Sequence, residues 1–442
     1  MKLTPILSVI LWLSIGTLQS TANEARDEES NEVWSHELHK RLEKIKSFSR
    51  LHRHGSSVSL EPRDCSLTKF LEITEIPYGQ SGNQLIGFTH ALWVADKTES
   101  TLVVPTYMED MLRPFKLHGL RSMHCFVDNS VYQHHKSTKG DSIKTVEIES
   151  EDSFFLTNIL GGGIHAGKYP KGTFPPLDSK LVDEMSLHFL DVFSTLWGHI
   201  KPVVMSETLR ILRTKMSANL KYTAVHKRGL DGGCSKIFLG NFDEADAQAI
   251  SSQIPLESAD WKSLHSSALC EMNAGFISDI MKLNHREMAV RSVDSDTSEP
   301  VFLAWDGKGS IESYKNSNAQ VVLSSEFSQQ HDQSELKASG IIKTSDLLKF
   351  VDLFIAVNAD FFVLNPRSTF SFEIYTIRAI LGLQSVPLPP TKDLYMLSVA
   401  DYKKKSTAGA EGWDGLWVNW ASISKARLAA INPLNIIHHG NN

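Results

Sequence analysis

Residues 70–105 read FLEITEIPYGQSGNQLIGFTHALWVADKTESTLVVP. The apolar residues of 70–76 predict a strand, and a glycine-containing loop follows at 77–83. Apolar side chains at helical spacing predict a helix over 83–97, and a second short strand is expected at 101–104, before a proline. Strand, loop, helix and strand form a βαβ unit, so this stretch predicts an α/β fold with a parallel sheet.

A second alternating series occupies the later half of the chain. It predicts strands at 222–226, 301–305, 320–323 and 361–364, and helices at 261–283, 346–356 and 370–381. A helix at 181–196 precedes this series. The expected fold is therefore α/β, with two Rossmann-like domains at 65–205 and 206–385 that face a cleft. In such sheets ligands bind beyond the carboxyl ends of the strands.

The first candidate site is the loop 77–84, PYGQSGNQ, between the first strand and its helix. Gly79 and Gly82 allow the backbone to approach a ligand closely. The start of the helix offers backbone N–H groups to an anion or a polar sugar. The same glycines also suit a tight turn that has no ligand.

The second candidate site is the segment HKRGLDGGC at 226–234, which follows a predicted strand. Arg228 can bind a phosphate through two parallel N–H bonds. His226 can orient that phosphate or contact the nucleotide, and Asp231 can hold the arginine or a ribose hydroxyl. The alternative is a strand end that carries a surface arginine.

Two further strand ends carry polar residues. Ser368 and Thr369 open a predicted helix after the strand 361–364, where they can cap the helix or bind a phosphate. Asp306 follows the strand 301–305, where its carboxylate can accept hydrogen bonds from a guanine or a ribose. A turn that begins with aspartate is the alternative interpretation of Asp306.

Together these motifs resemble those of the GDP-fucose protein O-fucosyltransferases, and the type acting on EGF-like repeats is the most similar. The resemblance rests on Pro77-x-Gly79-x-x-Gly82-Asn83-Gln84, on His226-x-Arg228, on the apolar strand that ends in Asp306, and on the helix, strand and Ser/Thr-Phe step of 352–371. The motifs follow the family's order over residues 70–382.

The resemblance implies a GT-B-like fold and an inverting transfer of fucose from GDP-fucose that needs no metal and no cofactor. It implies that Arg228 binds the β-phosphate and stabilises the leaving GDP, and that Asn83 lies near the fucose and the acceptor oxygen. Arg228 and Asn83 are thus the implied catalytic residues. The implied donor-binding residues are Gly79, Gly82, Asn83, His226, Arg228, Asp231, Asp306, Ser368, Thr369 and Phe370.

The sequence also departs from the family pattern. Asp231 stands one position closer to the His-x-Arg motif than expected, and Gly307-Lys308-Gly309 follows Asp306 in place of an acidic or polar step. Beyond Pro387 the sequence shows no similarity to the family. The C-terminal extension 386–442 therefore gives no prediction of the acceptor.

The N-terminus predicts entry into the secretory pathway. Residues 5–18 form an apolar run that is shorter than the roughly 20 residues of a spanning helix. Residues 1–22 therefore fit a signal peptide, with a short type II anchor as the alternative. The polar segment 23–64 carries apolar residues at helical spacing, Trp34 to Leu51, and is expected to be a helical stem or docking helix, or else a solvated spacer.

Cysteine count and charge agree with a luminal enzyme. Four cysteines suggest up to two disulfides in an oxidising compartment. The pairing Cys65–Cys125 with Cys234–Cys270 respects the predicted domains, although the sequence allows three pairings. The net charge is −6, which argues against a nucleic-acid partner.

Three other patterns are interpreted as structural. Residues 162–168 have the spacing of a phosphate loop, but Tyr169 replaces its hydroxyl residue and Pro170 prevents the helix. Asp294-Ser295-Asp296 has the spacing of a metal-dependent transferase motif but lies in a polar run. His134-His135 lacks partners at ligand spacing.

The sequence therefore predicts a fucosyltransferase of the endoplasmic reticulum or Golgi lumen, whose donor is GDP-fucose. The acceptor is expected to be a Ser or Thr hydroxyl of a protein, such as a small disulfide-rich domain. A glycan acceptor is the first alternative. A non-catalytic protein of the same fold that binds sugar nucleotides is the second. Contact with a membrane is expected only through an N-terminal anchor.

Overall fold

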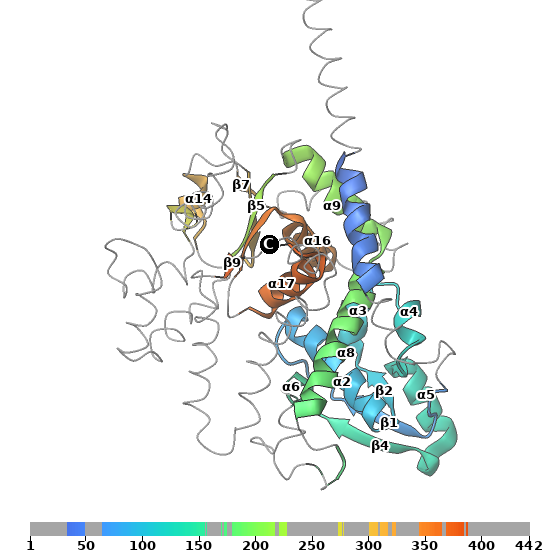
Figure 1. Ribbon diagram of the computed structural model, residues 1–442. Coiled ribbons are helices and arrows are strands. Elements are labelled where there is room, and N and C mark those ends of the chain that lie inside the picture. Colours follow the sequence, from blue (N-terminus) through green and yellow to red (C-terminus); the bar gives the residue numbers. More distant parts are fainter. Residues whose placement is uncertain are drawn as a thin grey trace, which may run out of the picture.

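The chain forms two parallel sheets with helices packed against them (Figure 1). The structure, a computed structural model, describes residues 33–48, 64–154, 156, 169, 172–174, 179–216, 221–227, 273–275, 277, 300–307, 310–316, 321–323, 344–364, 368–383 and 386–387. The α/β class and the two Rossmann-like parallel sheets of a GT-B-like fold are confirmed. The predicted cleft and domain limits stay predictions.

The first sheet has the strand order β3-β2-β1-β4, and all of its strands are parallel. These strands are β1 (Lys69–Ile73), β2 (Thr101–Val104), β3 (Phe126–Asp128) and β4 (Lys144–Ile148). The predicted helix after β1 is α2, which spans Ser81–Lys97. Phe70, opposite Thr101 in the register, has no solvent exposure, as expected for a central parallel strand.

The region after β2 contains several short elements that the sequence analysis did not predict. They are α3 (Thr106–Leu112), α4 (His118–Arg121), β3, α5 (Asn129–Lys139), the 3₁₀ turn η1 (Gly140–Ser142), β4 and α6 (Ser150–Phe154). β3 has only three residues, and four of the five side chains of β4 are exposed or half-buried. Neither strand therefore carries a clear apolar pattern.

The second sheet has the strand order β7-β6-β5-β8-β9 and is also parallel. Its strands are β5 (Thr223–Lys227), β6 (Val301–Trp305), β7 (Val321–Val322), β8 (Phe361–Leu364) and β9 (Val386–Pro387). Its described helices are α14 (Glu312–Lys315), α16 (Thr344–Asn358) and α17 (Thr369–Leu381). All five residues of β5 are buried between two neighbouring strands, which explains the apolar run that predicted it.

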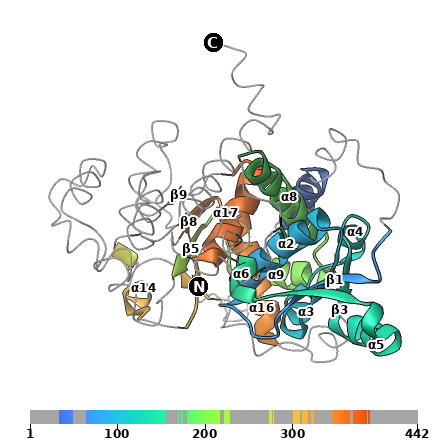
Figure 2. The ribbon, with the colours of Figure 1, turned by 90° about the horizontal axis from the view of Figure 1, so that it is seen from below.

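Two long helices connect the sheets along the chain. α8 (Ser179–Gly198) was predicted at 181–196, whereas α9 (Pro202–Lys215) was not predicted and spans the expected domain limit between residues 205 and 206. Pro202 opens α9, because proline at the first helical position loses no intrahelical bond. One buried hydrophobic cluster includes residues of both sheets and both helices, and Figure 2 shows α17 beside α8 and α2.

Residues 33–48 form a helix that packs against the second half of the chain. Trp34, Leu38, Leu42, Ile45 and Phe48, which share one face, are all buried. Arg41 Nη1 donates to Asn358 O at 2.8 Å, at the end of α16, and Lys44 Nζ donates to Leu381 O at 2.6 Å, at the end of α17. Cations at helix C-termini are stabilising. The solvated-spacer interpretation is therefore wrong for this segment.

A disulfide joins Cys65 to Cys125, as the preferred pairing predicted. Cys234 and Cys270 lie outside the described residues, as do the apolar run 5–18, the loop 162–168 and Asp294. His134 is exposed on α5, in agreement with its interpretation as a surface residue. Among the helices described here, none combines the length and the apolar character needed to cross a membrane.

Candidate functional site

The loop before α2 is shaped by one glycine. Gly79 has φ +66°, a left-handed conformation that favours glycine, and a Cβ atom there would lie 2.3 Å from Asn83 Nδ2. Gln84 Nε2 donates to Gly79 O at 3.1 Å and closes the loop onto the helix. The first motif thus holds Asn83 in the first turn of α2 with its side chain against the loop.

Asn83 also reaches the last motif, 286 residues further along the chain. Thr369 Oγ1 donates to Asn83 Oδ1 at 2.7 Å. A Cβ atom on Gly82 would lie 2.7 Å from Thr369 Oγ1, so the glycine allows the N-terminal turns of α2 and α17 to approach. The structure therefore brings the first and last sequence motifs together.

The His-x-Arg motif joins the same group through its histidine. His226 is buried near the carboxyl end of β5, and its Nδ1 shares a hydrogen bond of 2.7 Å with Ser371 Oγ. The ring centroids of His226 and Phe370 are 4.8 Å apart. Ser371 was part of the quoted motif, but the sequence did not assign it a role.

The first turn of α17 follows the carboxyl end of β8. Ser368 is buried and its carbonyl accepts a hydrogen bond from the Phe372 N–H at 3.0 Å, while Thr369 and Phe370 are half-buried. Helix N-termini favour anions, because their backbone N–H groups and the helix dipole both attract negative charge. The arrangement is suited to a phosphate.

The other predicted residues are placed only in part. Asp306 is exposed and directly follows β6, the strand that pairs with β5 and aligns Trp305 with Lys227. Asp306 therefore leaves the same sheet at the same edge as His226. Arg228 and Asp231 lie outside the described residues.

Glu373 is a residue of the candidate site that the sequence analysis did not single out. It lies one helical turn after Thr369, and its Oε1 would be 3.0 Å from a Cβ atom on Gly82. Within the described part of the chain, this buried oxygen has no hydrogen-bond partner. Burial raises the pKa of the Glu373 carboxyl from 4.5 to about 8, so the group is largely protonated at neutral pH. The i, i+4 spacing from Thr369 was the available signal.

We expect Glu373 to make stability depend on pH. Its pKa is raised in the folded state, so its contribution is complete below about pH 4.5 and is lost as pH rises toward 8. Glu373→Gln should therefore match the wild type near pH 4 and be more stable at pH 7.5, by on the order of 3 kcal/mol. Urea unfolding at both pH values measures this difference.

The matched control is Glu151→Gln, which changes an exposed glutamate on α6. We expect its effect on the free energy of unfolding to be the same at both pH values. If the difference in the free energy of unfolding between Glu373→Gln and the wild type did not grow with pH, the Glu373 carboxyl would be ionised in the folded protein.

Comparisons with known proteins give a distant likeness. No family model and no curated protein matches the sequence. Among solved structures, the apo form of POFUT1 is similar at 14% identity and a TM-score of 0.40, over 74% of this chain and 99% of that chain. POFUT1 in complex with GDP-fucose is similar at 13% identity and a TM-score of 0.39, over 72% of this chain and 95% of that chain.

Proposed function

We propose that this chain is a glycosyltransferase that moves fucose from GDP-fucose to a Ser or Thr hydroxyl of a protein in the secretory lumen. The transfer is inverting and uses neither a metal nor a cofactor. One observation carries the proposal. The hydrogen bond from Thr369 Oγ1 to Asn83 Oδ1 joins two motifs that were singled out for donor binding and lie far apart in sequence.

The contacts around that bond give each residue a role. The first turn of α17, with Ser368 and Thr369, binds the diphosphate of the donor. Phe370 and His226, whose rings lie together, line the nucleotide side. Asn83 is held beside the phosphate-binding turn, where its amide Nδ2 can donate to the fucose or the acceptor oxygen.

The reaction is a single displacement. The acceptor oxygen attacks the anomeric carbon of fucose, the bond from that carbon to the β-phosphate oxygen breaks, and GDP leaves with the electron pair. The acceptor's proton passes to solvent or to the departing phosphate. Negative charge grows on the β-phosphate, and Arg228 together with the α17 N-terminus stabilises it.

The Cys65–Cys125 disulfide supports a luminal location, because disulfides persist in oxidising compartments. The apolar run 5–18 directs the chain there, as a cleaved signal or as a type II anchor. The endoplasmic reticulum and the Golgi both fit this proposal.

Calorimetric titration tests the donor. The purified protein should retain the helix 33–48, because Arg41 and Lys44 bind the ends of α16 and α17. We expect selective binding of GDP-fucose over GDP-mannose, UDP-glucose and ATP, and the same affinity in EDTA. No guanine-nucleotide binding by folded protein would overturn the proposal. Binding without transfer to any protein or glycan would favour the non-catalytic alternative.

Thr369→Val is expected to lower the affinity for GDP-fucose about tenfold and to leave the fold intact. Valine has the shape of threonine but no hydroxyl, so it loses both the bond to Asn83 and a phosphate contact. Calorimetry of the variant measures the change. Thr138→Val, on the exposed face of α5, is the matched control and should bind as the wild type does. Equal affinity in both variants would remove Thr369 from the site.

A further inference from the structure

Three metal-ligating side chains meet at the end of α2 that is remote from the candidate site. Asp96 lies in the last turn of α2, His124 directly precedes Cys125 and β3, and His188 lies on α8. One ligand atom from each lies within 4.8 Å of the other two. The imidazole rings of His124 and His188 have centroids 4.9 Å apart and are nearly perpendicular.

The hydrogen bonds around the cluster determine which ring nitrogens carry hydrogen. His188 Nε2 lies 3.1 Å from Thr89 O, and a carbonyl only accepts, so Nε2 donates and Nδ1 keeps its lone pair. Neutral imidazole is the form that binds metals.

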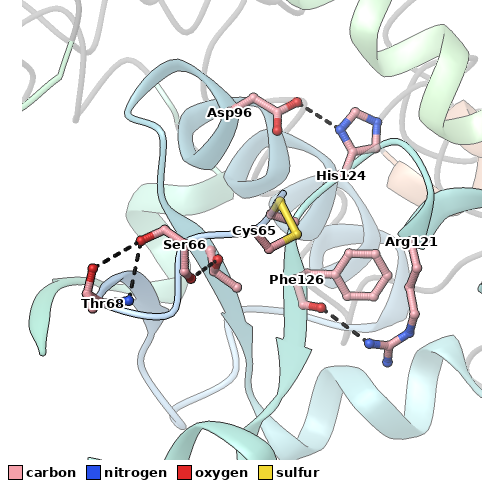
Figure 3. The surroundings of a disulfide bond; sticks show 9 residues. Cys65, Ser66, Thr68, Asp96, Arg121, His124 and Phe126 are labelled. Carbon is pink, nitrogen blue, oxygen red and sulfur yellow. Dashed lines mark hydrogen bonds and ion pairs between the residues drawn. A yellow bond between two sulfur atoms is a disulfide. The ribbon is translucent and has the colours of Figure 1, made fainter. Parts of the chain in front are cut away.

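His124 has the complementary arrangement. Its Nδ1 lies 2.8 Å from Asp96 Oδ2, and Figure 3 shows the two side chains pointing toward each other beside the disulfide. The residue is 7% exposed, and in the described residues its buried Nε2 has no hydrogen-bond partner. A buried polar atom without a partner is costly, unless an unseen ligand satisfies it.

We propose that His124, through Nε2, and His188, through Nδ1, bind a zinc ion that ties the end of α2, the segment before β3 and α8 together. Asp96 accepts the Nδ1–H of His124 and orients its ring toward the ion. Two imidazoles suit zinc, and two water molecules complete four-coordination. The bond from His188 to Thr89 O matches the way in which metal-binding histidines are usually oriented.

The surroundings suit a site that stabilises the fold. A pocket of about 690 Å³, lined in part by Asp96, Ser100 and Cys125, lies beside the cluster. The Cys65–Cys125 disulfide constrains the same segment covalently. Asp96 and Asn83 lie 13 residues apart on α2, roughly 20 Å along the helix axis, so the ion does not contact the proposed donor site.

Zinc binding by the untagged full chain tests the proposal. After treatment with EDTA and dialysis, the protein is titrated with zinc and, separately, with cobalt, whose absorption reports tetrahedral nitrogen and oxygen ligands. We expect one equivalent of zinc to bind and to raise the midpoint of thermal unfolding. His188→Gln and His124→Gln should each weaken zinc binding at least about a hundredfold.

Two further variants make the result decisive. His134→Ala with His135→Ala removes a neighbouring pair on the α5 surface and should leave zinc binding unchanged. Asp96→Asn keeps the volume and a hydrogen-bond acceptor for His124 but removes the negative charge, so we expect it to weaken zinc binding about tenfold even if the histidine variants misfold. The proposal would be overturned if the wild-type protein bound no stoichiometric zinc. It would also be overturned if zinc binding were lost in the His134→Ala, His135→Ala variant but kept in the His124 and His188 variants. GDP-fucose binding is measured separately, so either proposal can fail alone.

Discussion

Arg228→Ala is expected to lower the rate of fucose transfer by about a hundredfold or more. The guanidinium is the proposed main donor to the β-phosphate, where charge develops as GDP leaves, and removing one such donor from an enzyme typically has an effect of this size. The measurement is kcat with saturating GDP-fucose and a protein acceptor. Because the group acts in the transition state, kcat should fall more than the affinity for the donor.

Two comparisons sharpen this prediction. Arg228→Lys keeps the charge but loses the two parallel N–H bonds, so we expect only partial activity. Lys168→Ala removes the lysine of the segment that has phosphate-loop spacing, and it should leave both donor affinity and kcat intact. Unchanged turnover in Arg228→Ala would remove the central assignment of the proposed mechanism.

The sequence could predict the site's motifs because they stand at strand ends. β5 and β8 were predicted from apolar runs, and parallel strands place their carboxyl ends at one edge. Both motifs were therefore expected at the sheet edge where ligands bind, and the structure shows that His226 contacts Ser371. The bond between Asn83 and Thr369 joins the two halves of the chain, and no local pattern specifies it.

Other residues were missed because their importance depends on packing. Glu373 looks like an ordinary helix residue, and only its buried position beside Gly82 raises its pKa. Asp96, His124 and His188 lack the short spacings by which metal sites are recognised, because three different elements supply them. Short elements such as β3 were missed for a different reason. A strand of three residues is too short to show an alternation of apolar and polar side chains.

Arg378→Met is expected to lower the free energy of unfolding by about 3–5 kcal/mol, the largest effect on stability that we predict. Arg378 lies on α17 and is fully buried, and burial lowers its pKa to about 9. Its guanidinium donates to the carbonyls of Ala356, Val357, Ala359 and Asp360. These carbonyls belong to the end of α16 and the turn into β8.

Methionine matches much of the arginine's volume but donates no hydrogen bond. The last carbonyls of a helix have no intrahelical partners, so Arg378→Met leaves several buried acceptors unsatisfied at once. Urea unfolding measures the loss, and Arg113→Met is the matched control. Arg113 is 38% exposed in its side chain and pairs with Asp110 three residues away, so its loss should cost no more than about 1 kcal/mol.

The same contacts connect stability to the proposed donor site. Arg378 fixes α17 against the end of α16 and the start of β8, and α17 begins with Thr369. If this positioning matters, folded Arg378→Met at low temperature should bind GDP-fucose more weakly than Arg113→Met does. If both arginine variants lost equally little stability, water would have to satisfy the carbonyls at the end of α16 that Arg378 binds. The packing of α16 against α17 would then hold Thr369 in place without the Arg378 guanidinium.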